Sequence, residues 1–328
     1  MNITLTHTIK ANENAKVLHM IIIHDGRIAS CSSDKTIKIF SLLTYLCEIT
    51  IPAHDDEIWY IAELPSYNIV SCSDDSSIKV WSITKNNYTL VHSIPNAHVG
   101  YITQILPISE NRMVSCGHDE TIKIWSSVPP FALVKLLKEK NESESRQNTL
   151  YELKDKNLLL TCSVFGNGLT VYNLKTYCKE TVIKAKAFDR NSIVKYEHYI
   201  LLGGYSTLTI IDSETYKIYK EKDCWKYGDV FCFLPTIKSL VIFAAGEGKL
   251  LLLNLNEDSS LNYKEKEAHD DAINCLLRIN DDEFASCSND GTIKFWKGIA
   301  SLKTDHELFL EEEERNKDNI FLIDGFFN

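Results

Sequence analysis

Residues 286–296 of the chain read SCSNDGTIKFW, and three other stretches repeat this pattern closely. They are SCSSDKTIKIF at 30–40, SCSDDSSIKVW at 71–81 and SCGHDETIKIW at 115–125. Each stretch contains a turn with Asp, followed by an alternating apolar run that ends on an aromatic residue. Self-similarity of this kind is the signature of a repeat architecture. The chain is therefore expected to consist of repeated units of short strands and tight turns.

An Ala-His pair stands upstream of three of these stretches, at His54, His98 and His269. In every case the His precedes the first Ser by 17 residues, that Ser precedes the turn Asp by four, and the Asp precedes the Trp by six. Chance does not keep four residue types in register three times. The spacing thus defines one structural unit that is used repeatedly.

One unit contains four strand-like runs, at 58–64, 68–73, 77–81 and 89–94, separated by turn residues. Four short antiparallel strands cannot bury both of their faces alone, so neighbouring units must stack. A four-stranded unit of this length is typical of the blade of a β-propeller. We therefore predict an all-β fold with four-stranded antiparallel blades.

The blade number follows from the spacing of the anchors. Phe40 and Trp296 are 256 residues apart, which six equal steps divide into units of about 43 residues. Weaker units with a turn and an apolar strand fill the gap after Trp125. We predict a single seven-bladed β-propeller over residues 1–297, with blades that end near Phe40, Trp81, Trp125, Tyr172, Ile211, Leu253 and Trp296.

These repeats resemble those of the WD-repeat β-propeller family, over about residues 1–297. The resemblance implies that each complete unit forms a buried hydrogen-bonded set of His, Ser, Asp and Trp. The first unit departs from it, with Asn12 near the His position and Phe40 in place of Trp. The expected sets are His54, Ser71, Asp75 and Trp81; His98, Ser115, Asp119 and Trp125; and His269, Ser286, Asp290 and Trp296.

The first residues of the chain predict how the ring closes. Ile3, Leu5, His7 and Ile9 alternate with threonines, as in a half-buried strand. In the WD-repeat family such an N-terminal strand completes the last blade. It thereby removes an open sheet edge.

The composition limits the class of partner. The 328 residues carry a formal net charge of -10 and are 44% hydrophobic, which is typical of globular proteins. Nucleic-acid binders usually carry a basic excess, so no direct nucleic-acid partner is expected. The longest uncharged apolar run, residues 17–23, is far too short to cross a bilayer, so no membrane insertion is expected.

Five of the ten cysteines occupy one repeated position, where a free Cys acts as a small apolar side chain. This placement favours reduced cysteines and a cytoplasmic location, with the nucleus or a cytoskeletal assembly as open alternatives. The five are Cys31, Cys72, Cys116, Cys162 and Cys287.

Catalytic signatures are incomplete. The Ser, His and Asp of each unit match a catalytic triad in composition, but their repetition in register favours a structural role. The zinc-protease-like string at His306 has Leu310 in place of its second His, and the stretch 246–249 lacks the hydroxyl residue of a phosphate loop. We predict no enzymatic activity, no cofactor and no metal site.

The WD-repeat resemblance also implies a partner surface on the narrow face of the propeller. Family ligands contact positions three and five residues after the His and the position just before the turn Asp. Trp and Tyr are enriched in interface hot spots, and acidic neighbours favour a basic or extended partner segment. The mapped residues are Glu57, Trp59, Asp74, Tyr101, Thr103, His118, Ala272, Asn274 and Asn289, with Ser33 added from the first unit. Trp59 could alternatively pack between blades.

The favoured function is a non-enzymatic protein-interaction scaffold, as a subunit of a larger intracellular complex. One alternative is a substrate receptor of a cullin-type ubiquitin ligase, although the strings WSIT, WSSV and WKGI lack the Arg common in such receptors. Another is a G-protein β-like signalling subunit. Such subunits have an N-terminal helix before the propeller, whereas a strand is expected at the start of this sequence. The paired Arg of a phosphoinositide-binding propeller is also missing.

Two segments depart from the repeat. Residues 138–148 are charged and rich in hydroxyl groups, and are expected to form a solvated loop between the third and fourth blades. Residues 298–328 form an acidic tail with an apolar end, in which a helix start is expected at Thr304. The apolar end is expected to pack on the propeller wall or to dock on a partner.

Overall fold

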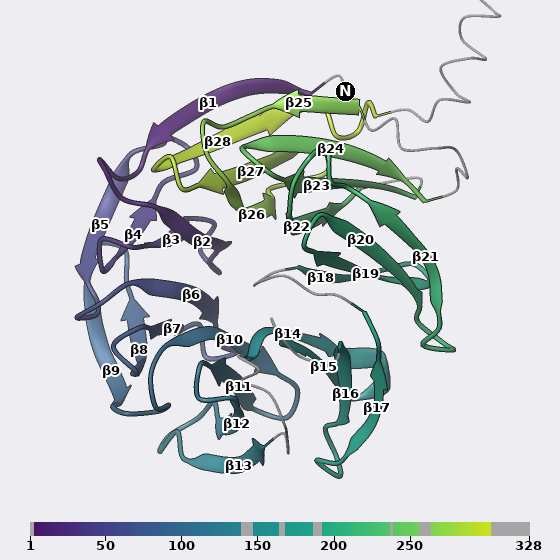
Figure 1. Cartoon of the computed structure of the whole chain (residues 1–328). Helices are drawn as coiled ribbons and strands as arrows, with labels where there is room; N and C mark the ends of the chain where they lie inside the picture. The colour runs from purple at the N-terminus through teal and green to yellow at the C-terminus, as the bar shows by residue number, and fades with distance from the viewer. Residues whose placement is uncertain are drawn as a thin grey trace, which may run out of the picture.

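The computed structural model describes residues 3–138, 147–163, 168–185, 192–236, 239–255 and 264–302. These residues form seven four-stranded antiparallel sheets arranged in a ring, and one edge strand of each sheet, the inner strand, lies nearest the centre (Figure 1). The prediction of a seven-bladed all-β propeller is confirmed. The expected loop at 138–148 and the expected tail helix lie almost entirely outside the described residues.

The first three blades follow one another along the chain. Blade 1 contains β2 (Val17–Ile22), β3 (Ile28–Ser32), β4 (Thr36–Phe40) and β5 (Cys47–Pro52). Blade 2 contains β6 (Ile58–Glu63), β7 (Ile69–Ser73), β8 (Ile78–Ile83) and β9 (Tyr88–Ile94). Blade 3 contains β10 (Ile102–Ile108), β11 (Arg112–Gly117), β12 (Thr121–Ser126) and β13 (Leu133–Lys138).

The next three blades repeat this order, and the last blade combines both ends of the described chain. Blade 4 contains β14 (Gln147–Leu153), β15 (Leu158–Ser163), β16 (Leu169–Asn173) and β17 (Lys179–Ile183), with the short 3-10 helix η1 (Lys154–Lys156) after β14. Blade 5 contains β18 (Ile193–Tyr196), β19 (Tyr199–Gly204), β20 (Thr207–Asp212) and β21 (Ile218–Asp223). Blade 6 contains β22 (Val230–Pro235), β23 (Leu240–Ala245), β24 (Lys249–Asn254) and β25 (Lys264–Glu267). Blade 7 contains β26 (Ile273–Arg278), β27 (Glu283–Ser288), β28 (Thr292–Lys297) and β1 (Thr4–Lys10).

All seven expected blade anchors lie in or at the end of the third strand of a sheet. This holds for Tyr172 in β16, Ile211 in β20 and Leu253 in β24, although their blades lack the His, Asp and Trp of the repeat. The alternating apolar residues of these strands are buried between blades. Apolar packing therefore builds a blade here without the polar set.

Strand β1 closes the ring by pairing antiparallel with β28, so that Leu5 lies opposite Trp296 and Ile9 opposite Ile293. The two ends of the described chain are thus joined in one sheet (Figure 1). The prediction that the N-terminal strand completes the last blade is confirmed.

The alternation predicted for this strand is only partly right. Ile3 and Ile9 are buried, whereas Leu5 is 48% exposed. The register shifts between Leu5 and His7, which leaves one extra residue on β1. Such a bulge turns the side chains before it onto the opposite face of the sheet. His7 is exposed, and its ring stacks on that of Tyr45 in blade 1 at 4.1 Å.

Polar side chains of the inner strands connect neighbouring blades. The Sγ atom of Cys275 in blade 7 lies 3.6 Å from the carbonyl oxygen of Met20 in blade 1, and the His19 ring stacks on that of Tyr60 in blade 2 at 3.8 Å. Gln104 in blade 3 accepts from the backbone N–H of Leu150 in blade 4 at 2.6 Å and donates to its carbonyl at 3.2 Å. These contacts fix the register of one blade against the next.

The unequal burial of Leu5 and Ile9 predicts unequal effects of two truncations on one strand. Ile9→Ala removes a buried side chain and should lower the free energy of unfolding by about 2–4 kcal/mol. Leu5→Ala removes a half-exposed one and should lower it by less than about 1 kcal/mol. Urea denaturation of both variants measures the difference. Equal losses would contradict the difference in burial between the two side chains.

Candidate functional site

The loops of the propeller fall on two ends of the ring. The connections that carry His54, His98 and His269 lead into an inner strand, and they share one end with the turns between second and third strands, because adjacent strands are antiparallel. We call this the histidine end. The connections between first and second strands, and between third and fourth strands, form the far end.

Each complete repeat brings four side chains together at the histidine end. In blade 2, His54 Nδ1 lies 2.8 Å from Asp75 Oδ2, and His54 Nε2 lies 2.7 Å from Ser71 Oγ. The indole N–H of Trp81 donates to the same Ser71 Oγ at 3.0 Å. In blade 3 the distances from His98 to Asp119, from His98 to Ser115 and from Trp125 to Ser115 are 2.9, 2.6 and 2.8 Å. In blade 7 the distances from His269 to Asp290, from His269 to Ser286 and from Trp296 to Ser286 are 2.8, 2.6 and 2.8 Å.

Two further residue types belong to these sets and were missed from the sequence. Ser77 Oγ donates to Asp75 Oδ1 at 2.7 Å, and Lys79 Nζ donates to the carbonyl of Ala53 at 2.8 Å. The signal was present, because a hydroxyl always stands two residues after the Asp and a Lys two residues before the Trp. The equivalents are Thr121 and Lys123 in blade 3, and Thr292 and Lys294 in blade 7.

The electrostatics of each set favour an ionised Asp and a neutral His. Burial alone would raise the pKa of Asp75, but hydrogen bonds from His54 and Ser77 outweigh it and hold that pKa well below its usual value. Burial lowers the pKa of His54, and the hydrogen bond to Asp75 offsets only part of this effect. The pKa of Asp119 and that of His98 are lowered for the same reasons.

These sets cannot act as catalytic triads. Ser71, Ser115 and Ser286 are 0% exposed, so no substrate carbonyl can reach a hydroxyl. Each Ser hydroxyl also accepts an indole N–H, which fixes its orientation. The arrangement holds the loop, the turn and two strands of one blade together.

The candidate partner residues form pairs across the histidine end. The indole N–H of Trp59 donates to Asp74, and the Tyr101 and His118 rings lie 5.1 Å apart. The amide of Asn274 donates to Asn289 Oδ1 at 2.8 Å and to the carbonyl of Val17 at 2.8 Å. In each pair one residue comes from the inner strand or its preceding loop and the other from the turn before the third strand.

The exposure of these candidates varies. Tyr101 is 47% exposed, and Trp59 is half-buried because it packs against the apolar core between blades 1 and 2. Thr103 is only 3% exposed and lies near Cys116, so it cannot contact a partner directly. Ser33 Oγ accepts the backbone N–H of Lys16. Glu57, Asp74, His118, Ala272, Asn274 and Asn289 are partly exposed.

Three of the candidate residues occupy the same irregular position of their inner strands. The register of the inner strand shifts around Trp59, Thr103 and Asn274, so each is the extra residue of a bulge. A bulge re-aims a side chain and bends the strand. The sequence contains no direct signal for it, because the bulged residues are chemically unrelated.

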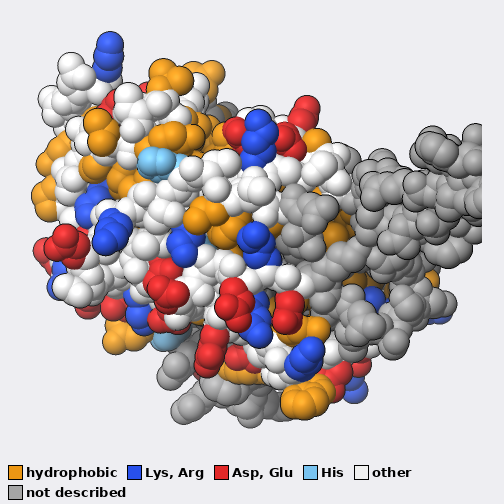
Figure 2. Space-filling model, turned by 90° about the horizontal axis from the view of Figure 1, so that it is seen from above, with side chains coloured by type: hydrophobic (Ala, Val, Ile, Leu, Met, Phe, Trp, Pro, Cys, Tyr) orange, Lys and Arg blue, Asp and Glu red, His pale blue; other side chains and the backbone are white. Residues whose placement is uncertain are grey.

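Acidic side chains concentrate at the histidine end. Among the described loop residues at this end, the basic ones are Lys16, Lys35, Lys184 and Lys226, and the acidic ones are Glu13, Asp34, Asp55, Asp56, Glu57, Asp74, Asp75, Asp119, Glu120, Asp229, Glu247, Asp270, Asp271 and Asp290. Acidic and basic residues are balanced in the described loops of the far end, and they are intermixed on the outer wall seen in Figure 2. The histidine end therefore carries most of the negative potential and attracts cationic groups.

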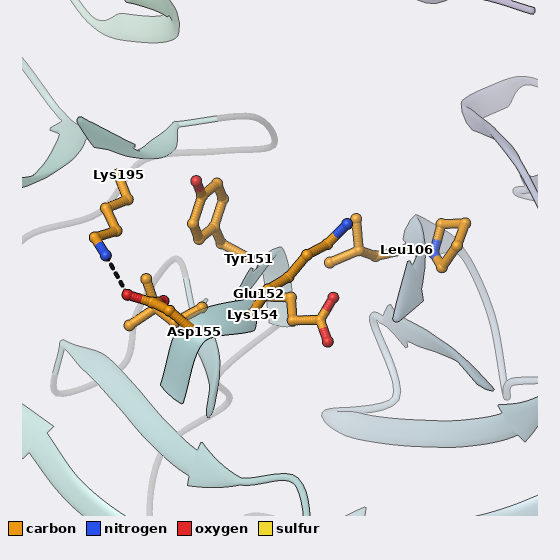
Figure 3. Close-up of a pocket in the computed structure, with 8 residues that line it drawn as sticks. Leu106, Tyr151, Glu152, Lys154, Asp155 and Lys195 are labelled. Carbon is orange, nitrogen blue, oxygen red and sulfur yellow. Dashed lines mark hydrogen bonds and ion pairs between the residues drawn. The ribbon is translucent and has the colours of Figure 1, made fainter. Parts of the chain in front are cut away.

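The far end has a cavity of about 570 Å³ where the inner strands of blades 3, 4 and 5 end (Figure 3). Lys195 pairs with Asp155 across it at 2.5 Å, and Glu152 Oε1 accepts the backbone N–H and hydroxyl of Ser109. The remaining lining residues are Leu106, Pro107, Tyr151, Leu153 and Lys154. The eight residues of the wall include no Ser, Cys or His.

Among the described residues, no group of three or more His, Cys, Asp or Glu side chains is placed to hold a metal ion. The same part of the chain contains no helix with the length and hydropathy needed to span a membrane.

Comparison with known families gives one match. The family model described as WD domain, G-beta repeat, matches residues 3–41, 45–82, 88–126 and 262–297. The four segments end at or next to Phe40, Trp81, Trp125 and Trp296, the clearest anchors of the repeat. Comparison with curated proteins gives no match.

The buried sets predict a large difference between two aspartates of blade 7. Asp290→Ala leaves His269 and Thr292 without a buried acceptor and should lower the free energy of unfolding by about 1–3 kcal/mol. Asp281→Ala, at an exposed far-end position, should change it by no more than about 0.5 kcal/mol. Thermal and urea unfolding measure both. Matching losses would show that the Asp290 set does not stabilise the blade.

The lowered pKa values predict that acid destabilises the fold in two steps. Below pH 6.5 the unfolded chain takes up protons that the folded His54 and His98 do not, so the free energy of unfolding should fall by up to about 1.4 kcal/mol per pH unit for each group. Below pH 3.8 the aspartates of the sets add to the loss, because their folded pKa values are depressed. Urea titrations from pH 7.5 to 3 measure the slope, and His98→Asn should reduce it between pH 6.5 and 5. An unchanged slope in that variant would contradict the assignment.

Proposed function

We propose that this chain, a WD-repeat β-propeller, is a non-enzymatic protein-interaction scaffold whose histidine end binds a basic, extended segment of a partner protein. The acidic excess in the loops of this end is the observation that carries the proposal. A propeller of this family is commonly such a scaffold. Electrostatic complementarity would then supply a fast association rate and selectivity against acidic partners.

The structure of the loops supports a preformed binding surface. The hydrogen-bonded sets of blades 2, 3 and 7 hold both loops of each blade at the histidine end, so little conformational entropy would be lost on binding. Tyr101 presents an exposed ring, and Trp59 presents part of its indole beside Asp74. Aromatic residues next to carboxylates provide both contact area and charge for a lysine or arginine of the partner.

We further propose that the chain acts as a subunit of a larger complex in the cytoplasm. The rigid ring offers several surfaces at once, and the buried free cysteines suit a reducing compartment. The closed Ser-His-Asp sets support a role without catalysis. A cullin-type substrate receptor and a G-protein β-like subunit remain the alternatives, and binding to a cullin adaptor in a pull-down would favour the first of them.

The partner surface predicts the effect of a double truncation. Trp59→Ala combined with Tyr101→Ala should lower the affinity for the physiological partner by at least about 2 kcal/mol, because hot-spot aromatics dominate interface energies. Affinity purification with quantitative mass spectrometry identifies proteins that the wild-type chain retains and the variant loses. Leu43→Ala with Tyr67→Ala, two exposed far-end residues, is the matched control.

A melting curve separates binding from folding. Partners retained by the Trp59/Tyr101 variant at unchanged melting temperature would refute the site. A collapsed melting temperature would instead place Trp59 in the core between blades 1 and 2, where part of its ring already packs.

A further inference from the structure

Trp225 is a conspicuous exception to the burial of large apolar side chains. It is 75% exposed and lies at the histidine end, in the connection between β21 of blade 5 and β22 of blade 6. Tryptophan is highly buried on average in folded proteins. An indole displayed to this extent therefore calls for a physical explanation.

Backbone hydrogen bonds show which position of the repeat Trp225 occupies. The N–H of Cys224 donates to the carbonyl of Ser206 at 2.7 Å, as the N–H of Ala53 donates to that of Lys35 at 3.1 Å. Cys224 thus takes the place of the Ala in the Ala-His pairs, and Trp225 takes the place of the His. The residue that is buried in blades 2, 3 and 7 is replaced here by an exposed one.

The core of blade 6 explains why the Trp225 side chain is not buried as the equivalent His side chains are. Phe243 is paired with Leu251 across β23 and β24, as Ser71 is paired with Lys79 in blade 2. Phe243 is fully buried and occupies the position of the Ser that forms a hydrogen bond with the His in the complete blades. An apolar core therefore replaces the polar set, and the loop residue projects into solvent.

The loop holds Trp225 in a defined position. Cys224 is fully buried, and its carbonyl accepts the N–H groups of Tyr227 and Gly228 at 2.7 and 3.0 Å. Asp223 Oδ1 accepts the N–H of Trp225 itself at 2.8 Å. A side chain displayed on a pinned turn loses little entropy when a partner covers it.

A second exposed aromatic residue lies on the adjoining loop. Tyr205 is 45% exposed, in the turn between β19 and β20 of blade 5. Its neighbour Ser206 accepts from Cys224 and donates its N–H to Asp229 Oδ1 at 2.9 Å, which connects the two loops. Tyr205 and Trp225 together form what we call the Trp225 patch.

The charges of the molecule indicate what covers this patch. The tail of this chain is a poor candidate, because the described chain leaves blade 7 at the far end. There the backbone N–H groups of Gly298 and Ile299 donate hydrogen bonds to the carbonyl of Asp282. The tail sequence is also acidic at residues 311–314 and would be repelled by the histidine end. A second copy carries the same acidic end. The loop of Trp225 itself carries one basic and one acidic residue, Lys226 and Asp229, whereas the histidine end as a whole is acidic. A basic partner segment is therefore the occupant that the charges of this end favour.

We propose that Trp225 anchors an arginine or lysine side chain of the basic partner segment, which stacks on the exposed indole. This proposal rests on the proposed function and extends its site across the ring, from blades 2 and 3 to blades 5 and 6. Tryptophan is the aromatic residue that binds a cation best through the face of its ring, and arginine is the more frequent partner.

Binding of a defined probe tests the proposal. The probe is a fluorescein-labelled 12-residue peptide of alternating Arg and Ser, and the control peptide has citrulline, which is neutral and of similar shape, at every Arg. Fluorescence anisotropy should show that Trp225→Ala weakens binding of the Arg peptide by about twofold to fivefold. Trp225→Phe should lose less, and Leu43→Ala at the far end should lose nothing.

Nuclear magnetic resonance supplies a direct readout. The indole N–H signal of Trp225, identified by its loss in Trp225→Phe, should shift when the full chain is titrated with the Arg peptide and stay in place with the citrulline peptide. Equal shifts with both peptides would overturn the cation contact in favour of apolar docking. Self-association of the wild-type chain that Trp225→Ala abolishes would overturn it in favour of a second copy.

The outcomes separate this proposal from the proposed function. If Glu57→Gln and Trp59→Ala weaken binding of the Arg peptide while Trp225→Ala does not, the histidine end binds basic segments and the Trp225 anchor is wrong. If the wild-type chain binds neither peptide, both proposals fail. An unchanged melting temperature of Trp225→Ala, expected for an exposed side chain, excludes unfolding as the cause of a loss.

Discussion

The structure depends on the inability of one blade to bury its own faces. A four-stranded sheet has two apolar faces, and each face is covered by one of the two neighbouring blades in the ring. The pairing of β1 with β28 closes the ring, because it completes the sheet of blade 7 with a strand from the other end of the chain. The contacts of Cys275 with Met20 and of His19 with Tyr60 then hold blades 7, 1 and 2 in register.

Much of this fold could be predicted from the sequence, because the requirements of one blade are repeated along the chain. The turn Asp and the aromatic anchor recur at fixed spacing, and the apolar alternation persists in blades 4 to 6 where the polar residues are lost. The bulge in β1 could not be predicted, because Leu5 and Ile9 are equally apolar and only the pairing with β28 places them on different faces. Residue type alone carries no information about register.

The candidate site was predictable to a lesser extent. The His, Ser and Asp residues could be located because their chemistry is specific, whereas the Lys and the additional Ser or Thr that complete each set resemble ordinary strand residues. Thr103 was expected to contact a partner, but it is buried and its hydroxyl donates to the carbonyl of Cys116 in β11. Trp225 was not among the predicted residues, because the candidate positions were mapped from the His and the turn Asp, which blades 5 and 6 lack. Its exposure results from Phe243, which lies 18 residues further along the chain and fills the space of the missing set.

The closure of the ring has a consequence for biosynthesis. The side chain of Thr4 reaches the carbonyl of Lys297, 293 residues away in sequence, so the first strand has no partner until the last blade has left the ribosome. During that time β1 and the exposed edge of each finished blade are available for pairing with other chains. Nascent chains of this protein should therefore depend on chaperones, and the rate of translation through the last blade should affect the yield of folded protein more than the rate through the first.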